Sequence, residues 1–167
     1  GSAGLRHMKN LLSLGHRISS VYDPEQSRVG EVKRIAPDVK IAEKEAQAFA
    51  EPCDAVLICS PPADHLRQLN IALENGRDAF VEKPLSHTLE GTAEAARKAE
   101  KDGRIVLVGC NLRFFSSLQR VKHLLDTGSV GRPLSARVYG GYYLPYWRPH
   151  LDYRQSYSAQ AKLGGGV

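Results

Sequence analysis

The sequence predicts an α/β fold: a Rossmann-like doubly wound parallel sheet that lacks its first strand, followed by the beginning of a C-terminal α/β substrate domain with a largely antiparallel sheet. Short apolar runs alternate with helical stretches of ten to fifteen residues, which is typical of βαβ units. The run Ala55-Val56-Leu57-Ile58 is uninterrupted, as in parallel strands buried on both faces. After Gly109 an alternating pattern takes over. We therefore expect a dinucleotide-binding domain over residues 1–110 and an incomplete substrate and oligomerisation domain over residues 111–167.

Composition narrows the function classes. The chain has 167 residues and a net charge of +5, but its 23 basic residues are scattered among 18 acidic ones. This argues against a nucleic-acid groove and agrees with a small anionic ligand. The three cysteines have no metal-ligand spacing, so no metal site is predicted. No apolar stretch is long enough to span a membrane, and we expect a cytoplasmic protein with reduced thiols.

The N-terminal stretch combines a helix with a partial dinucleotide fingerprint. Leucines and Met8 recur at helical spacing up to Gly15, and residues 18–22 are predicted to form a strand that ends at Asp23-Pro24. Gly1 and Gly4 match the second and third glycines of the fingerprint, and Asp23 lies about 20 positions further on. The preceding strand and the first glycine are absent. Alternatively, Gly1-Ser2 is a cloning scar and Asp23 is a helix-capping or turn residue.

Further elements follow in regular order. Helices are expected over residues 25–36, 43–50, 65–75 and 88–101, with strands over 39–41, 54–59, 79–82 and 105–109. Residues 60–62, Ser-Pro-Pro, break the second of these strands, and His65 opens a helix with a leucine stripe. Pro84 ends the strand that precedes it. Because ligands bind at the carboxyl ends of parallel strands, Lys83 is expected beside a ligand, although a solvated turn lysine explains the same residues.

The chain changes character after Gly109. A helix carries Leu118, Val121 and Leu125 on one stripe, and Leu134, Ala136 and Val138 then alternate with polar residues, which predicts a strand with unlike faces. An aromatic and basic loop over residues 142–157 leads to a glycine run at 164–166.

Together these motifs resemble the Gfo/Idh/MocA family of nicotinamide-dependent oxidoreductases. The resemblance is carried by Gly1-Ser2-Ala3-Gly4 with Asp23, Ser60-Pro61-Pro62-Ala63-Asp64-His65, Glu82-Lys83-Pro84-Leu85-Ser86, Asn111-Leu112-Arg113-Phe114, Gly131-Arg132-Pro133 and the glycine run. It covers essentially the whole chain. The aromatic loop looks like that of members associated with bacterial surface-sugar synthesis.

The resemblance implies a cofactor site. The helix start at Gly1, Ser2, Ala3 and Gly4 would hold a pyrophosphate, and Asp23 would bind ribose hydroxyls and favour NAD over NADP. Ser60, Pro61 and His65 would line the adenosine side; a plain residue at a helix start explains His65 nearly as well. The remaining cofactor-binding residues would be Glu82, Lys83 and Pro84.

The resemblance also implies catalytic and substrate residues. Lys83 would act on the substrate hydroxyl, and in the family a cis peptide bond often precedes Pro84. Asn111 and Arg113 would orient a sugar or polyol, or Arg113 would form an interface ion pair. Tyr143, Tyr146, Trp147 and Arg148 would form a lid over sugar rings, or an arm that covers a neighbouring subunit of a homo-oligomer.

The chain ends before the Asp and His that the family carries on a later helix. We therefore expect a fragment of an oxidoreductase that transfers hydride between NAD and a secondary hydroxyl. Its sheet would have an empty central lane and its chain would begin in a helix near Ala3; alone it would be poorly soluble and inactive. The alternatives are a non-catalytic dinucleotide sensor or regulator, sharing every cofactor residue, and a nucleic-acid-binding protein, which the scattered charges disfavour.

Overall fold

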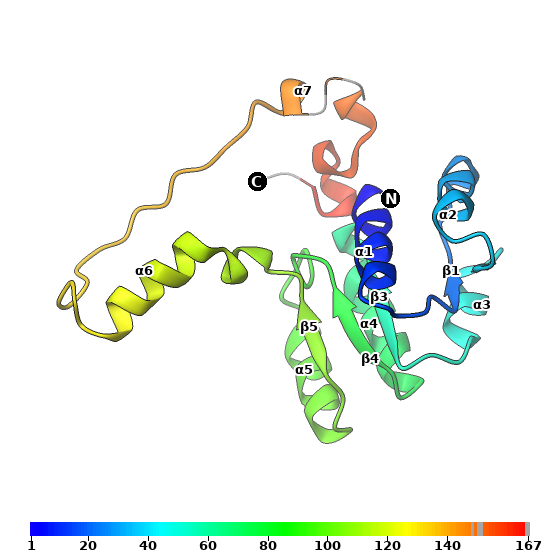
Figure 1. Ribbon diagram of the computed structural model, residues 1–167, viewed down its shortest axis with the longest axis horizontal. Helices are drawn as coiled ribbons and strands as arrows, with labels where there is room; N and C mark the ends of the chain where they lie inside the picture. The colour runs from blue at the N-terminus through cyan, green and yellow to red at the C-terminus, as the bar shows by residue number, and fades with distance from the viewer. Residues whose placement is uncertain (148, 150–151, 166–167) are drawn as a thin grey trace.

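The computed structural model describes residues 1–147, 149 and 152–165 and contains two parallel sheets (Figure 1). One pairs β1 (Ser20–Val21) with β2 (Lys40–Ile41), and the other has the order β3 (Ala55–Ile58), β4 (Asp78–Val81), β5 (Val106–Val108). Every pairing is parallel. The expected parallel α/β architecture is confirmed.

Helices follow the strands as the βαβ pattern predicts. They are α1 (Ser2–Ser13), α2 (Val29–Ile35), α3 (Glu45–Ala50), α4 (Pro62–Glu74), α5 (Thr92–Lys101), α6 (Ser116–Asp126) and the short α7 (Leu144–Trp147). Single 3-10 turns occupy Gln26–Arg28, Asn111–Phe114, Tyr153–Gln155, Tyr157–Ala159 and Ala161–Leu163. Helix α4 begins three residues before His65, because a proline suits the first helical turn.

A gap separates the two sheets. A cavity of about 960 Å³ is lined by residues of both β1 and β3. The chain starts in α1 at Ser2. Two expectations are therefore confirmed for the described residues: no strand lies between β1 and β3, and the chain begins in a helix.

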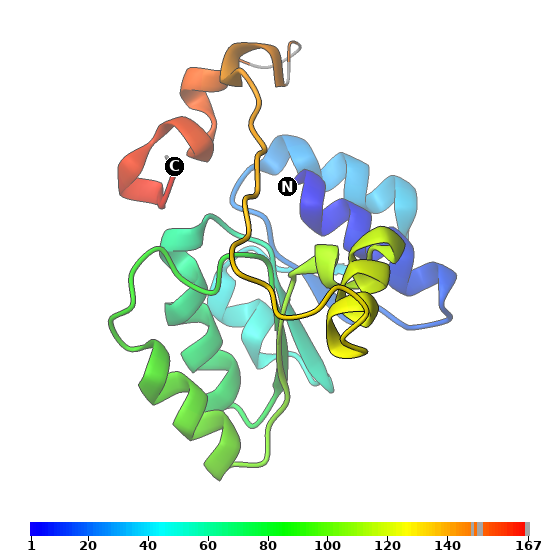
Figure 2. The same ribbon diagram turned by 90° about the vertical axis from the view of Figure 1, so that its left-hand side faces the viewer.

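The sheet β3–β4–β5 is covered on one face by α4 and α5 (Figures 1 and 2). Ile58 and Val81 point to that face and are buried with Leu69, Leu73, Ala95 and Ala99. On the opposite face Leu57, Phe80 and Leu107 form one cross-strand row, in which Leu57 and Leu107 are 37% and 51% exposed. The expectation of burial on both faces is thus wrong for this sheet in the part of the chain described. Helix α1 contacts Phe80, the middle residue of the row, edge-on through His7, and Leu57 and Leu107 on either side stay partly exposed.

A smaller core joins the N-terminal elements. Met8 of α1, Val32 of α2 and Val39 are buried together, with Val21 and Ile41 packed against them. Helices α1 and α2 lie side by side (Figure 2). This core holds the β1–β2 pair next to α1.

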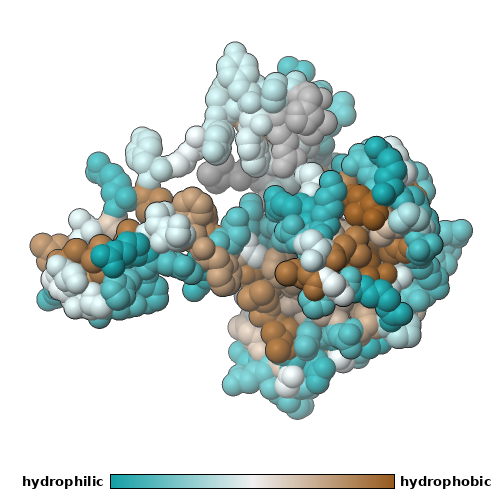
Figure 3. Space-filling view, in the orientation of Figure 1, coloured by the Kyte–Doolittle hydropathy of each residue, from teal (hydrophilic) through white to brown (hydrophobic). Residues whose placement is uncertain are grey.

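After Gly109 the chain leaves the packed body. Helix α6 projects away from the sheets, and a single thread then returns to α7 (Figure 1). The predicted strand at residues 134–138 is wrong: the segment has no ladder, and Leu134 and Val138 are 91% and 94% exposed, since no described strand runs beside it. Figure 3 shows hydrophobic residues on the projecting segment that contains α6. Among the described residues no helix has both the length and the hydropathy to cross a membrane.

Candidate cofactor-binding site

Three turns follow the carboxyl ends of the parallel strands β3, β4 and β5. Ser60-Pro61 follows β3, Glu82-Lys83-Pro84 follows β4, and Cys110-Asn111 follows β5. Neighbouring parallel strands end at the same edge of a sheet, so the topology gathers these turns. This edge is where ligands bind in open α/β sheets.

The start of α1 approaches the end of β3. A Cβ added at Gly4 would lie 3.6 Å from Cys59 Cβ, an ordinary van der Waals distance, so the helix start lies against the end of β3. No acidic residue occupies the first turn of α1, and its N-cap, Gly1, offers no side-chain acceptor. The backbone N–H groups of this turn are therefore suited to bind an anion.

Asp23 stands beside this helix start. Its Oδ2 accepts a hydrogen bond from the Gly1 amino group at 2.6 Å, and Arg28 Nη1 lies 3.7 Å from the same oxygen. Oδ1 accepts a hydrogen bond from the Glu25 backbone N–H at 3.0 Å, so Asp23 also stabilises the turn that follows it. Burial by itself raises the pKa of Asp23, but the hydrogen bonds from Gly1 and Glu25 and the nearby positive charges hold it below its ordinary value.

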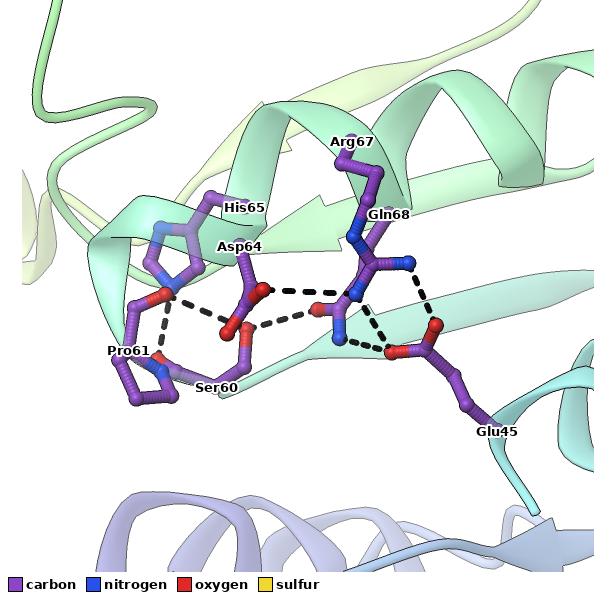
Figure 4. A network of polar contacts seen from close by, with 7 residues as sticks. All are labelled: Glu45, Ser60, Pro61, Asp64, His65, Arg67 and Gln68. Carbon is purple, nitrogen blue, oxygen red and sulfur yellow. Dashed lines mark hydrogen bonds and ion pairs between the residues drawn. The ribbon is translucent and has the colours of Figure 1, made fainter. Parts of the chain in front are cut away.

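A polar network holds Ser60 against α4 and α3 (Figure 4). Ser60 Oγ donates to Gln68 Oε1 at 2.7 Å, and Gln68 Nε2 donates to Glu45 Oε1 at 2.5 Å. Arg67 binds both oxygens of Glu45, at 2.5 and 2.9 Å. The hydrogen bonds from Arg67 hold the pKa of Glu45 below its ordinary value. The Ser60 side chain is thereby oriented before any ligand arrives.

His65 lies beneath this turn and is only 1% exposed. Its Nε2 is 2.9 Å from the Ser60 carbonyl oxygen, and its Nδ1 is 2.7 Å from that of Pro84. The ring contacts backbone on both sides, so the geometry favours a supporting role over the direct cofactor contact expected from the sequence.

The Glu82-Lys83-Pro84 turn is tied to α1. Glu82 Oε1 is 2.8 Å from His7 Nε2 and 3.4 Å from Arg6 Nη2, while Oε2 accepts the Lys83 backbone N–H at 3.1 Å. Burial raises the pKa of Glu82, but these hydrogen bonds and charges outweigh it and hold the pKa below its ordinary value. Lys83 is exposed, and among the described residues its ammonium has no hydrogen-bond or ion-pair partner. The Lys83–Pro84 peptide bond is cis, as the resemblance implies.

The expected substrate residues do not converge. Asn111 and Arg113 lie exposed on a 3-10 turn that leads to α6, whereas Tyr143 and Trp147 lie at α7, at the other end of the thread (Figure 1). Within the aromatic segment, Tyr143 and Tyr146 pack edge to face with ring centroids 5.0 Å apart. Arg148 lies outside the described residues.

Several supporting residues escaped sequence reasoning. His7 contacts Glu82, 75 positions away, and Gln68 accepts from Ser60, eight positions away. Glu45 accepts from Gln68 across 23 positions and so supports Ser60 indirectly. Gly164 packs on the start of α4, where a Cβ would meet Pro62 Cβ at 2.9 Å, and its φ of +78° favours glycine. Of these contacts, only that of Gly164 had a signal in the sequence, the glycine run. The others depend on which helices face each other.

Comparison with known proteins agrees with this arrangement. Residues 1–110 match the family described as "Oxidoreductase family, NAD-binding Rossmann fold" (GFO_IDH_MocA). The chain is 34% identical over 137 residues to scyllo-inositol 2-dehydrogenase (NAD(+)) of Bacillus subtilis, covering 80% of this chain and 40% of that protein. It is 27% identical over 169 residues to myo-inositol 2-dehydrogenase of Thermotoga maritima, covering 100% of this chain and 48% of that protein.

A solved structure shows the same fold. The WlbA (WbpB) dehydrogenase of Thermus thermophilus, in complex with NAD and alpha-ketoglutarate, superimposes with a TM-score of 0.66 and 27% identity, covering 73% of this chain and 42% of that chain. The chain thus spans less than half the length of these relatives. The family match covers residues 1–110, and the parallel sheet agrees with it. The chain therefore belongs to the Gfo/Idh/MocA family of oxidoreductases.

Proposed function

We propose that this chain is the dinucleotide-binding part of an NAD-dependent oxidoreductase that acts on a secondary hydroxyl of a sugar, polyol or sugar derivative. One observation carries the proposal: the helix start, the Ser60 turn and Lys83 meet at one sheet edge in a chain of this family. The inositol dehydrogenases to which it is similar support the substrate class. The activity of the whole protein, its homo-oligomeric state and its cytoplasmic location remain parts of this proposal.

The residues present fit a dinucleotide. The first turn of α1 has unpaired backbone N–H groups and no acidic side chain, which suits a pyrophosphate. Asp23 lies next to that turn with an ionised carboxylate, which accepts hydrogen bonds from ribose hydroxyls and repels a 2′-phosphate. When bound, NAD supplies a hydride-accepting nicotinamide.

Lys83 is proposed as the residue that acts on the substrate. Its exposed ammonium follows β4, where it can donate a hydrogen bond to the substrate oxygen and stabilise negative charge there. The Glu82 carboxylate holds the Lys83 backbone N–H and so fixes the root of the side chain.

Kinetics of the whole protein with an inositol substrate test this role. Lys83→Ala should lower kcat by about 10² to 10⁴, as for other positioned proton-transfer groups, with a much smaller change in NAD affinity. Lys9→Ala, at an exposed site on α1, is the matched control and should leave both unchanged. Equal losses in kcat and affinity would make Lys83 a dinucleotide contact instead.

A non-catalytic dinucleotide sensor is the second candidate. The separation of Asn111 and Arg113 from the α7 aromatic residues favours it, because the substrate residues do not form one site in this chain. NAD binding without turnover of any sugar or polyol by the whole protein would decide for the sensor.

A further inference from the structure

His65 connects two turns that belong to different strands. Its imidazole is 1% exposed, and each ring nitrogen faces a backbone carbonyl oxygen: that of Ser60 after β3 and that of Pro84 after β4. A neutral ring donates to one of these carbonyls, and a protonated ring donates to both. Either way, the ring fills the space between the two turns.

The support beneath the ring is rigid. His65 lies in the first turns of α4, and Leu69, one turn later, is 2% exposed in the main core. The same helix holds the Ser60 hydroxyl through Gln68 (Figure 4). Ser60 is thus held at its carbonyl oxygen and at its hydroxyl by one helix, and Pro84 is held by that helix next to Lys83.

We infer that His65 is a positioning residue that sets the spacing between the Ser60 turn and the Lys83-Pro84 turn. The inference rests on the proposed function: the resemblance puts the Ser60 turn on the adenosine side of the dinucleotide, and Lys83 acts on the substrate, next to the nicotinamide that accepts its hydride. A dinucleotide that reaches both turns depends on their spacing, whereas a ligand that reaches one turn does not.

Hydrogen exchange of the whole protein tests the coupling without any cofactor. His65→Leu removes both polar contacts at similar volume, and exchange should accelerate in peptides that cover residues 58–65 and 81–87 together. Leu69→Val is the control, a core change one turn later on the same helix that leaves both ring contacts of His65 in place; its effect should spread over the core cluster and not concentrate in these two segments. Unchanged exchange at either turn in His65→Leu would overturn the coupling.

Binding of two probes tests the consequence. His65→Leu should weaken NADH by on the order of tenfold, as expected for losing one buried hydrogen bond, and ADP-ribose by less than about twofold. His65→Asn, whose amide NH2 group can donate to one of the two carbonyls, should recover part of the NADH affinity. Leu69→Val should change both ligands equally. Equal loss of both ligands in His65→Leu would reduce His65 to a general structural role.

The two arms separate this inference from the proposed function. A wild-type protein that binds neither NADH nor ADP-ribose would refute the proposed function, and with it the role in cofactor spacing. Hydrogen exchange would still decide whether His65 couples the turns.

Discussion

Helices α4 and α6 carry similar leucine-rich stripes and yet have opposite surroundings. In α4 Leu69 and Leu73 are each 2% exposed, whereas in α6 Leu118, Val121 and Leu125 are 46%, 52% and 42% exposed. Helix α4 lies on the face of β3 and β4, and α6 projects from the body without a sheet beneath it (Figure 1).

An amphipathic pattern thus specifies a helix and its apolar face but supplies no surface to cover that face. The elements before Gly109 find their partners within the chain, and they hold the cofactor residues at one edge. The elements after Gly109 are helical or extended without a core of their own among the described residues.

Core truncation should separate the two helices most clearly. Leu69→Ala should lower the free energy of unfolding by about 2–5 kcal/mol, because it leaves a cavity beneath the sheet. Leu125→Ala, the same change at a 42% exposed site, should cost less than about 1 kcal/mol. Urea unfolding of both variants measures this, and equal losses would mean that α6 is packed in solution.

Discrimination between NAD and NADP should depend only on residues before Gly109. Asp23→Ser removes the carboxylate beside the α1 start, and the ratio of NADP to NAD affinity should rise by about tenfold or more. Arg113→Ala, beyond Gly109, is the control and should leave this ratio unchanged. Titration with both cofactors decides, and tighter binding of NADP than NAD by the wild type would contradict the role of Asp23.

Lowering the pH should weaken the contacts of Glu82 that connect α1 with the Lys83 turn. Because the folded-state pKa of Glu82 is lowered, its contribution to stability is present above the unfolded pKa, near 4.5, and is lost as the pH falls through the folded pKa. Glu82→Gln should therefore cost about 1 kcal/mol at neutral pH and progressively less in acid. Glu94→Gln, in an exposed pair with Arg97, should show no such pH dependence in unfolding measured from pH 7 downward.

The smallest effect concerns α6 itself. Lys122 and Asp126 form an i,i+4 ion pair on its exposed surface, at 2.8 Å. Lys122→Ala should weaken the helix by about 0.3–0.5 kcal/mol without altering the unfolding midpoint of the sheet. Circular dichroism with rising salt measures the effect; a clear shift of the midpoint would show that α6 and the core unfold together.

The amino-acid sequence was sufficient to predict the parallel α/β class, the order of strands and helices up to Gly109, the missing strand between β1 and β3, and the turns that form the candidate site. These features follow from local signals: hydrophobic period, proline and glycine breaks, and motif spacing. The placement of Lys83 after a strand belongs to the same group.

Which faces of the helices and sheets are covered, and which side chains support the site, became known only from the folded structure. Burial of Leu69 and exposure of Leu125, the bare row of Leu57 and Leu107, and the loss of the expected strand at 134–138 depend on neighbours that no local pattern records. The contacts of His65 with two carbonyls, and of Glu82 with His7, join residues 5 to 75 positions apart. Such contacts arise from helix and sheet packing in three dimensions, so they become visible only when the chain is folded.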